Sequence, residues 1–293
     1  MPEPRLFTAM VTPFDDQGEV DYQKAGDLAV YLTENGSDGI VVCGTTGESP
    51  VLTNDEKLKL FAVVKERVGD KAQVIANTGS YNTKASIEMS IKAQNLGVDG
   101  LMAITPYYNK PSQEGLYLHF KAIADAVSLP IMIYNVPGRT GVNLLPETLA
   151  RLAEIKNITS VKEACGDLDQ VSRIKTLVPK DFVIYSGDDS LTLPILAVGG
   201  SGIVSVVSHI VGNDLKAMID AYFAGQVEKA CQLHTKLFPI FKGMFIISNP
   251  VPIKEAMNLM GMKVGGFRLP LAPAPEKERE YIRKLLIDYG LIS

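Results

Sequence analysis

Short apolar runs alternate with longer amphipathic segments along most of this 293-residue chain. Successive runs begin roughly 30 residues apart, which is the length of one strand–helix unit. We expect strands at residues 6–11, 39–43, 73–76, 100–105, 130–134, 158–162, 182–186 and 203–206. Near-continuously apolar strands separated by helices favour a parallel sheet covered on both faces. Eight such units predict an α/β fold, a (β/α)8 TIM barrel.

The strand pattern stops after Val211, and only helical patterns follow, at residues 214–224, 226–247, 251–260 and 276–289. We therefore expect a barrel catalytic domain at residues 1–225 and a C-terminal helical domain at residues 226–293. A doubly wound sheet is the alternative fold. It is disfavoured because no glycine-rich dinucleotide fingerprint follows the first strand.

Composition narrows the classes of partner. The net charge is −4 and there is no basic run, which disfavours nucleic acid. The apolar stretches are too short to span a bilayer, and the start of the chain lacks the pattern of a signal peptide. Three scattered cysteines and three scattered histidines suggest neither a disulfide framework nor a metal site. A cytoplasmic protein without a membrane partner is the expectation.

Lys162 ends the apolar strand predicted at residues 158–162, which is an unusual place for a lysine. Burying an ammonium costs several kcal/mol unless the group is paired or neutralised. In one interpretation the side chain reaches solvent or pairs with Glu163. In the other, it is a desolvated amine with a lowered pKa, able to form a Schiff base with a ketone.

Polar and small residues gather after the other predicted strands, where (β/α)8 barrels carry their sites. They are Gly44, Thr45, Thr46 and Gly47 after the second strand, Tyr107 and Tyr108 after the fourth, Tyr134 at the end of the fifth, Arg139 beyond it, and Gly187 at the end of the seventh. This shared placement favours the desolvated interpretation of Lys162. An amine among hydroxyls, backbone donors and one arginine suits a small carboxylated ketone.

Each of these residues has a functional and a structural interpretation. Thr45 and Thr46 can donate to a carboxylate, or they can simply form the turn. Tyr134 can shuttle protons beside Lys162, or it can cap the core. Arg139 can bind a second carboxylate, or it can be a solvated loop residue. The glycine-rich loop at residues 199–202 suggests a phosphosugar aldolase, but no basic residue lies near it. A pyridoxal-phosphate enzyme would also use a lysine, but it needs a stronger phosphate site than this chain has.

Four segments together resemble the 4-hydroxy-tetrahydrodipicolinate synthase family, also called the dihydrodipicolinate synthases. They are GTTGES at residues 44–49, YY at 107–108, YNVPGRTG at 134–141 and VKEA at 161–164. The resemblance runs over essentially the whole chain, including residues 186–189 and 250–252. The wider superfamily includes N-acetylneuraminate lyase and other pyruvate-dependent aldolases. The Thr45–Thr46 pair and the Arg139 loop favour the synthase.

The resemblance implies that pyruvate forms an imine with Lys162, and that the derived enamine attacks L-aspartate 4-semialdehyde to give 4-hydroxy-tetrahydrodipicolinate in diaminopimelate and lysine biosynthesis. It implies no external cofactor. It also implies a homotetramer made of two tight dimers. The resemblance also implies a role for each site residue. Tyr134, Thr45 and Tyr108 form a proton relay, with Tyr108 contributed by the neighbouring subunit. Thr46, Gly187 and the main chain at Val204 bind substrate, and Arg139 binds the semialdehyde carboxylate.

Two other functions stay open on the sequence. One is a lyase for a sugar acid, either N-acetylneuraminate or 2-keto-3-deoxygluconate. The other is a catalytically silent barrel that senses keto acids. Intact Lys162, Tyr134, Thr45 and Arg139 favour an enzyme, because a pure binder has no need of the amine.

The resemblance also bears on feedback inhibition by L-lysine. Lysine-sensitive relatives bind this product with two histidines, an asparagine and a glutamate. Here the corresponding positions hold Asn54, Lys57, Tyr81 and Ala85, so we expect weak inhibition or none. Glu88, one helical turn beyond Ala85, is the residue that could restore a carboxylate.

Overall fold

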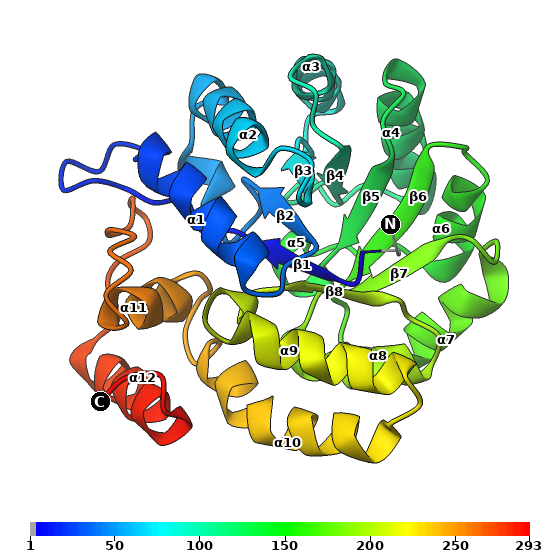
Figure 1. The fold of residues 1–293 in the computed structure, drawn as a ribbon. Helices are drawn as coiled ribbons and strands as arrows, with labels where there is room; N and C mark the ends of the chain where they lie inside the picture. Colours follow the sequence, from blue (N-terminus) through cyan, green and yellow to red (C-terminus); the bar gives the residue numbers. More distant parts are fainter. Residues whose placement is uncertain (1–3) are drawn as a thin grey trace. The chain divides into compact units, whose positions relative to one another are not determined.

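The computed structural model describes residues 4–293, and its strands form a closed barrel in chain order (Figure 1). The strands are β1 Leu6–Ala9, β2 Gly39–Val42, β3 Gln73–Asn77, β4 Gly100–Ile104, β5 Ile131–Asn135, β6 Ile158–Glu163, β7 Val183–Ser186 and β8 Gly202–Ser205. The pairings from β3 to β8, and that of β1 with β2, are parallel. The predicted (β/α)8 barrel is confirmed.

Helices follow the strands at the predicted places. They are α1 Tyr22–Glu34, α2 Asn54–Val68, α3 Thr83–Asn95, α4 Gln113–Ala126, α5 Pro137–Thr140, α6 Pro146–Ala153, α7 Leu168–Leu177, α8 Thr192–Ala197, α9 Ser208–Phe223, α10 Val227–Gly243, α11 Val251–Leu259 and α12 Glu276–Tyr289, with 3-10 turns η1 Ser49–Val51 and η2 Asp189–Leu191. A capping box begins α2, since the Thr53 hydroxyl accepts from the Glu56 N–H and the Glu56 carboxylate accepts from the Thr53 N–H. Within the described residues, no helix combines the length and apolarity needed to cross a bilayer.

Two elements differ from the expectation. The loop after β5 contains the short helix α5, which begins at Pro137, where the fixed φ of proline and its missing N–H suit a first helical position. Helix α9 begins at Ser208 rather than at residue 214, and it contains a non-helical residue, Val211, with φ −135°. The residues before this kink are buried, and Val206, Val207 and Ile210 among them are apolar, so their pattern resembles a continuation of the last strand.

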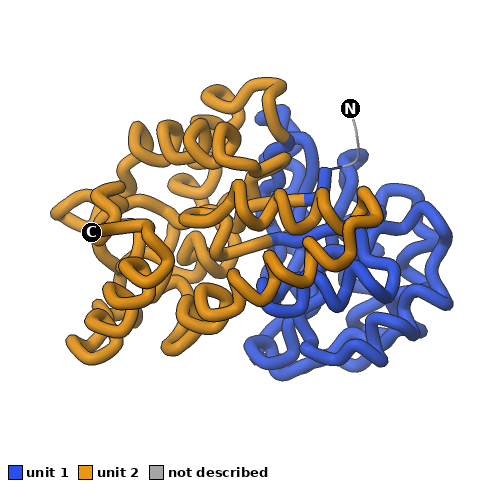
Figure 2. The backbone as a smooth tube through the Cα atoms, turned by 60° about the horizontal axis from the view of Figure 1, so that its bottom comes forward, with its two compact units in different colours: residues 1–5, 73–204 blue, residues 6–72, 205–293 orange. Residues whose placement is uncertain are grey.

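The chain divides into two compact units (Figure 2). Unit 1 contains Gln73–Val204 together with Pro4 and Arg5. It carries β3–β7, most of β8 and helices α3–α8. Unit 2 contains Leu6–Ala72 and Ser205–Ser293. In unit 2, α1 packs on α2, α9 on α10, and α12 on both α10 and α11. The predicted domain boundary at residue 226 lies inside unit 2 and stays a prediction.

Candidate active site

The carboxyl ends of β5, β6 and β7 place two rows of residues in register. Tyr134 is paired with Lys162, and Lys162 with Tyr185. Because strand side chains alternate between faces, these three share one face of the sheet, while the row that follows them faces the other way. That second row is Asn135, Glu163 and Ser186. All six residues are buried.

The Lys162 amine is removed from water. Its residue is 5% exposed, and its Nζ lies 4.2 Å from the centroid of the Tyr134 ring. Burial lowers the pKa of Lys162 to about 7; the buried Asp189 carboxylate opposes this shift, and Arg139 adds to it. About half of the amine is therefore neutral near pH 7, whereas an ordinary lysine titrates near pH 10.4. The burial of Lys162 therefore favours a desolvated amine over a side chain that reaches solvent.

Gly187 packs directly against this lysine. A Cβ at this position would lie 2.7 Å from the Ala164 Cβ and 3.2 Å from the Lys162 Cγ. Its N–H donates to the Glu163 carbonyl at 2.7 Å, so this donor already has an intramolecular partner. Gly187 thus lets the loop after β7 approach the stem of Lys162. Its role in binding substrate stays a prediction.

Behind the lysine lies a buried polar network that the sequence analysis did not single out. Asn135 Nδ2 donates to Glu163 at 3.0 Å and to Asn143 Oδ1 at 2.8 Å, and Gln170 Nε2 donates to Glu163 at 3.3 Å. Burial raises the pKa of Glu163, although these amides oppose the shift. Asn135 Oδ1 also accepts from the Leu144 N–H at 3.0 Å, which ties the segment after α5 to the end of β5. The signal in the sequence is a polar residue directly after Tyr134 and after Lys162.

The turn after β2 holds Thr45 and Thr46 and belongs to unit 2. Gly44 O accepts from the N–H groups of Gly47 and Ser49, at 3.1 and 3.3 Å. The Thr12 hydroxyl donates to Gly47 O at 2.6 Å. The expected glycine-bounded turn is present. Its threonines differ in burial, because Thr46 is 2% exposed and Thr45 is half-buried.

The remaining candidates are placed as follows. Arg139 lies in α5, and Val204 is buried in β8. Tyr108 has a left-handed backbone with φ 71°, and it is 93% exposed. A side chain this exposed cannot pack against the buried amine of its own chain. Lys162, Tyr134 and Gly187 are thus brought together within unit 1, and Tyr108 does not join them in this chain.

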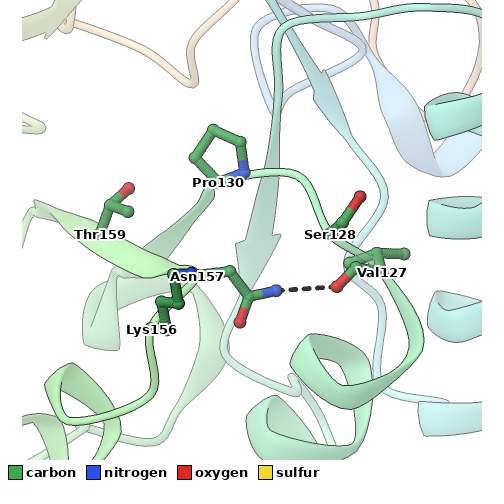
Figure 3. A pocket seen from close by; sticks show the side chains of 6 residues that line it. All are labelled: Val127, Ser128, Pro130, Lys156, Asn157 and Thr159. Atoms are coloured by element: carbon green, nitrogen blue, oxygen red, sulfur yellow. Dashed lines mark hydrogen bonds between the residues drawn. The ribbon is translucent and has the colours of Figure 1, made fainter.

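A pocket of about 450 Å³ lies at the opposite ends of β5 and β6 (Figure 3). Its lining residues are Val127, Ser128, Pro130, Lys156, Asn157 and Thr159. Asn157 Nδ2 donates to the carbonyls of Ala124 and Val127, at 3.0 Å each, so this side chain holds α4 to the start of β6. The amino-terminal face of such a barrel serves stability, and we assign this pocket no chemistry. Within residues 4–293, no cluster of three His, Cys, Asp or Glu side chains could hold a metal ion.

A closed parallel barrel with a desolvated lysine at the carboxyl end of a strand is typical of enzymes whose lysine forms a covalent intermediate with a carbonyl compound. The model of the dihydrodipicolinate synthetase family matches residues 3–288 of the chain. The 4-hydroxy-tetrahydrodipicolinate synthases of Heliobacterium modesticaldum and Moorella thermoacetica are each 58% identical to it, over 98% of this chain and over 96% and 99% of theirs. The dihydrodipicolinate synthase of Cyanidioschyzon merolae, solved with lysine bound, superposes with a TM-score of 0.97 at 47% identity, over 99% of each chain. The chain belongs to the dihydrodipicolinate synthetase family.

We predict that Lys162 titrates with a midpoint near pH 7. The neutral amine is favoured because burial penalises the charged form, so the neutral fraction rises as pH rises through 7. The measurement is 13C NMR of protein labelled at the lysine ε-carbon, with the Lys162→Met variant to assign the resonance. A Lys162 resonance that titrates only near pH 10, like surface lysines, would contradict the electrostatics of the site.

We also predict that Gly187→Ala lowers both stability and activity. The new methyl must displace Ala164 or the Lys162 stem, and overpacking of this kind costs about 1–3 kcal/mol. Urea unfolding and steady-state rates measure the two effects. Gly138→Ala is the matched control, because a Cβ at Gly138 meets no atom within 4 Å. Equal behaviour of the two variants would refute the packing account.

Proposed function

We propose that this protein is a Schiff-base lyase that condenses pyruvate with L-aspartate 4-semialdehyde to 4-hydroxy-tetrahydrodipicolinate, in diaminopimelate and lysine biosynthesis. The observation that carries the proposal is the buried Lys162 amine, whose pKa is lowered to about 7, in a chain of this family. The names of the close relatives support the synthase rather than a sugar-acid lyase.

The neutral Lys162 amine attacks the ketone carbon of pyruvate and forms a carbinolamine. Loss of water gives a protonated imine, which draws electrons from the adjacent methyl group, so that group loses a proton and an enamine results. The enamine carbon then attacks the aldehyde of the second substrate. The amino group of that substrate closes the ring onto the imine carbon and releases Lys162 unchanged.

Proton transfers at the nitrogen and the new hydroxyl need an acid–base group within reach. Tyr134 is a candidate close to the amine, since its ring packs against Lys162 Nζ. We assign the relay to Tyr134, Thr45 and Tyr108. Tyr108 is assigned to the site of a neighbouring subunit, and its 93% exposure with a left-handed backbone supports a role outside its own chain. Together with this assignment, we propose that the protein is a homotetramer built as a dimer of dimers.

Two carboxylates need separate partners. We assign the pyruvate carboxylate to Thr46 and the turn after β2, with Gly187 and the main chain at Val204 completing the substrate site. We assign the semialdehyde carboxylate to Arg139, because a guanidinium can bind a carboxylate with two parallel hydrogen bonds. A cytoplasmic location stays a prediction.

The test of function is a comparison of substrates with one enzyme preparation. We expect turnover of pyruvate with L-aspartate 4-semialdehyde, and a kcat/KM at least about 100-fold above that for cleavage of N-acetylneuraminate or 2-keto-3-deoxygluconate. Mass spectrometry of the products measures all three reactions. Faster cleavage of either sugar acid, or binding of pyruvate without turnover, would refute the proposal.

We predict that Arg139→Ala weakens use of the semialdehyde while leaving imine formation with pyruvate intact. Loss of a charge-assisted hydrogen bond costs about 1.5–3 kcal/mol, or roughly 10–100-fold in kcat/KM for the semialdehyde. The control is Arg173→Ala, which removes an exposed arginine paired with Glu147. Loss of imine formation at unchanged semialdehyde affinity would reverse the assignment.

We predict weak inhibition by L-lysine, or none. The Tyr81 ring packs edge-on against the Tyr107 ring, with centroids 5.1 Å apart, so it occupies volume beside Tyr107. Glu88 is exposed and lies 4.0 Å from Lys84. The measurement is activity against rising L-lysine, with Tyr81→Asn/Ala85→Glu as a variant expected to gain sensitivity. Full inhibition of the unmodified enzyme at submillimolar lysine, an ordinary small-ligand affinity, would contradict the prediction.

A further inference from the structure

A fully buried ion pair lies directly beside the threonine turn. Glu48 follows Gly47, and its Oε1 accepts from Lys254 Nζ of α11 at 2.9 Å. Both side chains are 0% exposed. The two residues are 206 positions apart in the sequence, so the pair joins the turn after β2 to the C-terminal helical segment.

Both charges are satisfied by further bonds. Lys254 Nζ also donates to the carbonyls of Thr12, at 3.1 Å, and Gly266, so three acceptors match its three hydrogens. The second Glu48 oxygen accepts from the Arg268 N–H at 3.2 Å. The ammonium also lies 4.4 Å from the centroid of the Phe14 ring.

The same helical segment binds the turn a second time. Asn249 Nδ2, just before α11, donates to Thr46 Oγ1 at 2.9 Å, and both residues are buried. This hydrogen bond ties the Thr46 side chain to the segment just before α11.

The backbone of the turn requires such support. Glu48 has left-handed angles, φ 56° and ψ 34°, which a residue with a Cβ rarely adopts. Gly47 is in close contact with the neighbouring main chain, since a Cβ there would lie 3.0 Å from Met10 O. A buried ion pair seldom adds net stability compared with apolar residues of the same size, so stability alone does not account for this one. Fixing the conformation of an unfavourable turn does account for it.

We propose that Lys254 and Glu48 are positioning residues that hold the Thr45–Thr46 turn in the conformation that binds the carboxylate of pyruvate. The proposal rests on the function proposed above. In this proposal α11 supports the substrate site indirectly, because Lys254 contacts the turn after β2 and not the substrate. Removing either charge releases the turn, so the affinity for pyruvate falls while the chemistry at Lys162 remains.

The variants for the test are Lys254→Met, Glu48→Gln and the double variant. We expect Lys254→Met to raise the KM for pyruvate by about tenfold or more, with little change in the KM for the semialdehyde. In this variant Glu48 is buried without its counter-ion, which is more costly than the loss of both charges together. We therefore expect the double variant to raise the KM for pyruvate less than Lys254→Met does.

The matched control is Lys216→Met. Lys216 Nζ lies 2.9 Å from Asp38 Oδ1 in the same unit, just before β2 and away from the turn after it. We expect this loss of an ion pair to lower the melting temperature without changing the KM for pyruvate.

The outcomes separate the two proposals. If the unmodified enzyme does not condense pyruvate with the semialdehyde, the proposed function fails before any variant is compared. If it does, and Lys254→Met and Glu48→Gln lower only the melting temperature, like Lys216→Met, the positioning role is refuted. Should Lys254→Met not fold, Glu48→Gln carries the test, because it keeps the shape of the side chain and removes its charge.

Discussion

A lysine ammonium that loses its water must find a counter-charge or give up its proton, and Lys162 lies between these outcomes. Its burial lowers the pKa, the Asp189 carboxylate holds the pKa up, and the result is a value of about 7. If the Lys162 ammonium were fully paired with a carboxylate, it would stay charged and would not attack a carbonyl. With no acidic neighbour, the protonated imine would lack stabilisation. The site is built around this intermediate state.

The polar groups behind the lysine form a buried hydrogen-bond network that holds neighbouring segments together. Glu163 faces away from Lys162 across the strand, and the amides of Asn135 and Gln170 satisfy it. In unit 2 the equivalent support is ionic, since Lys254 holds Glu48 beside the threonine turn. In both places a buried carboxylate and its hydrogen-bonded partners fix a loop that carries a candidate substrate residue, since Asn135, which donates to Glu163, also accepts from the Leu144 N–H. Such groups are costly to leave half-satisfied, so they favour one loop conformation.

The sequence predicted the barrel well because strand periodicity and turn residues are local signals. It also marked Lys162 and Tyr134, since each ends an apolar run. It could not show that Tyr185 extends the row beside Lys162, because register between strands is a tertiary property. It could not pair Glu48 with Lys254 either, since nothing local relates residues so far apart. The kink in α9 was hidden because its first residues are buried and follow an apolar run that resembles a strand.

The central claim is that the Lys162 amine is the reacting nucleophile. The most direct measurement is borohydride reduction in the presence of pyruvate, followed by peptide mapping by mass spectrometry. We expect one reduced pyruvate on the peptide that contains Lys162, and none in the Lys162→Met variant. An adduct on another lysine, such as the buried Lys254, or no adduct at all, would contradict the account.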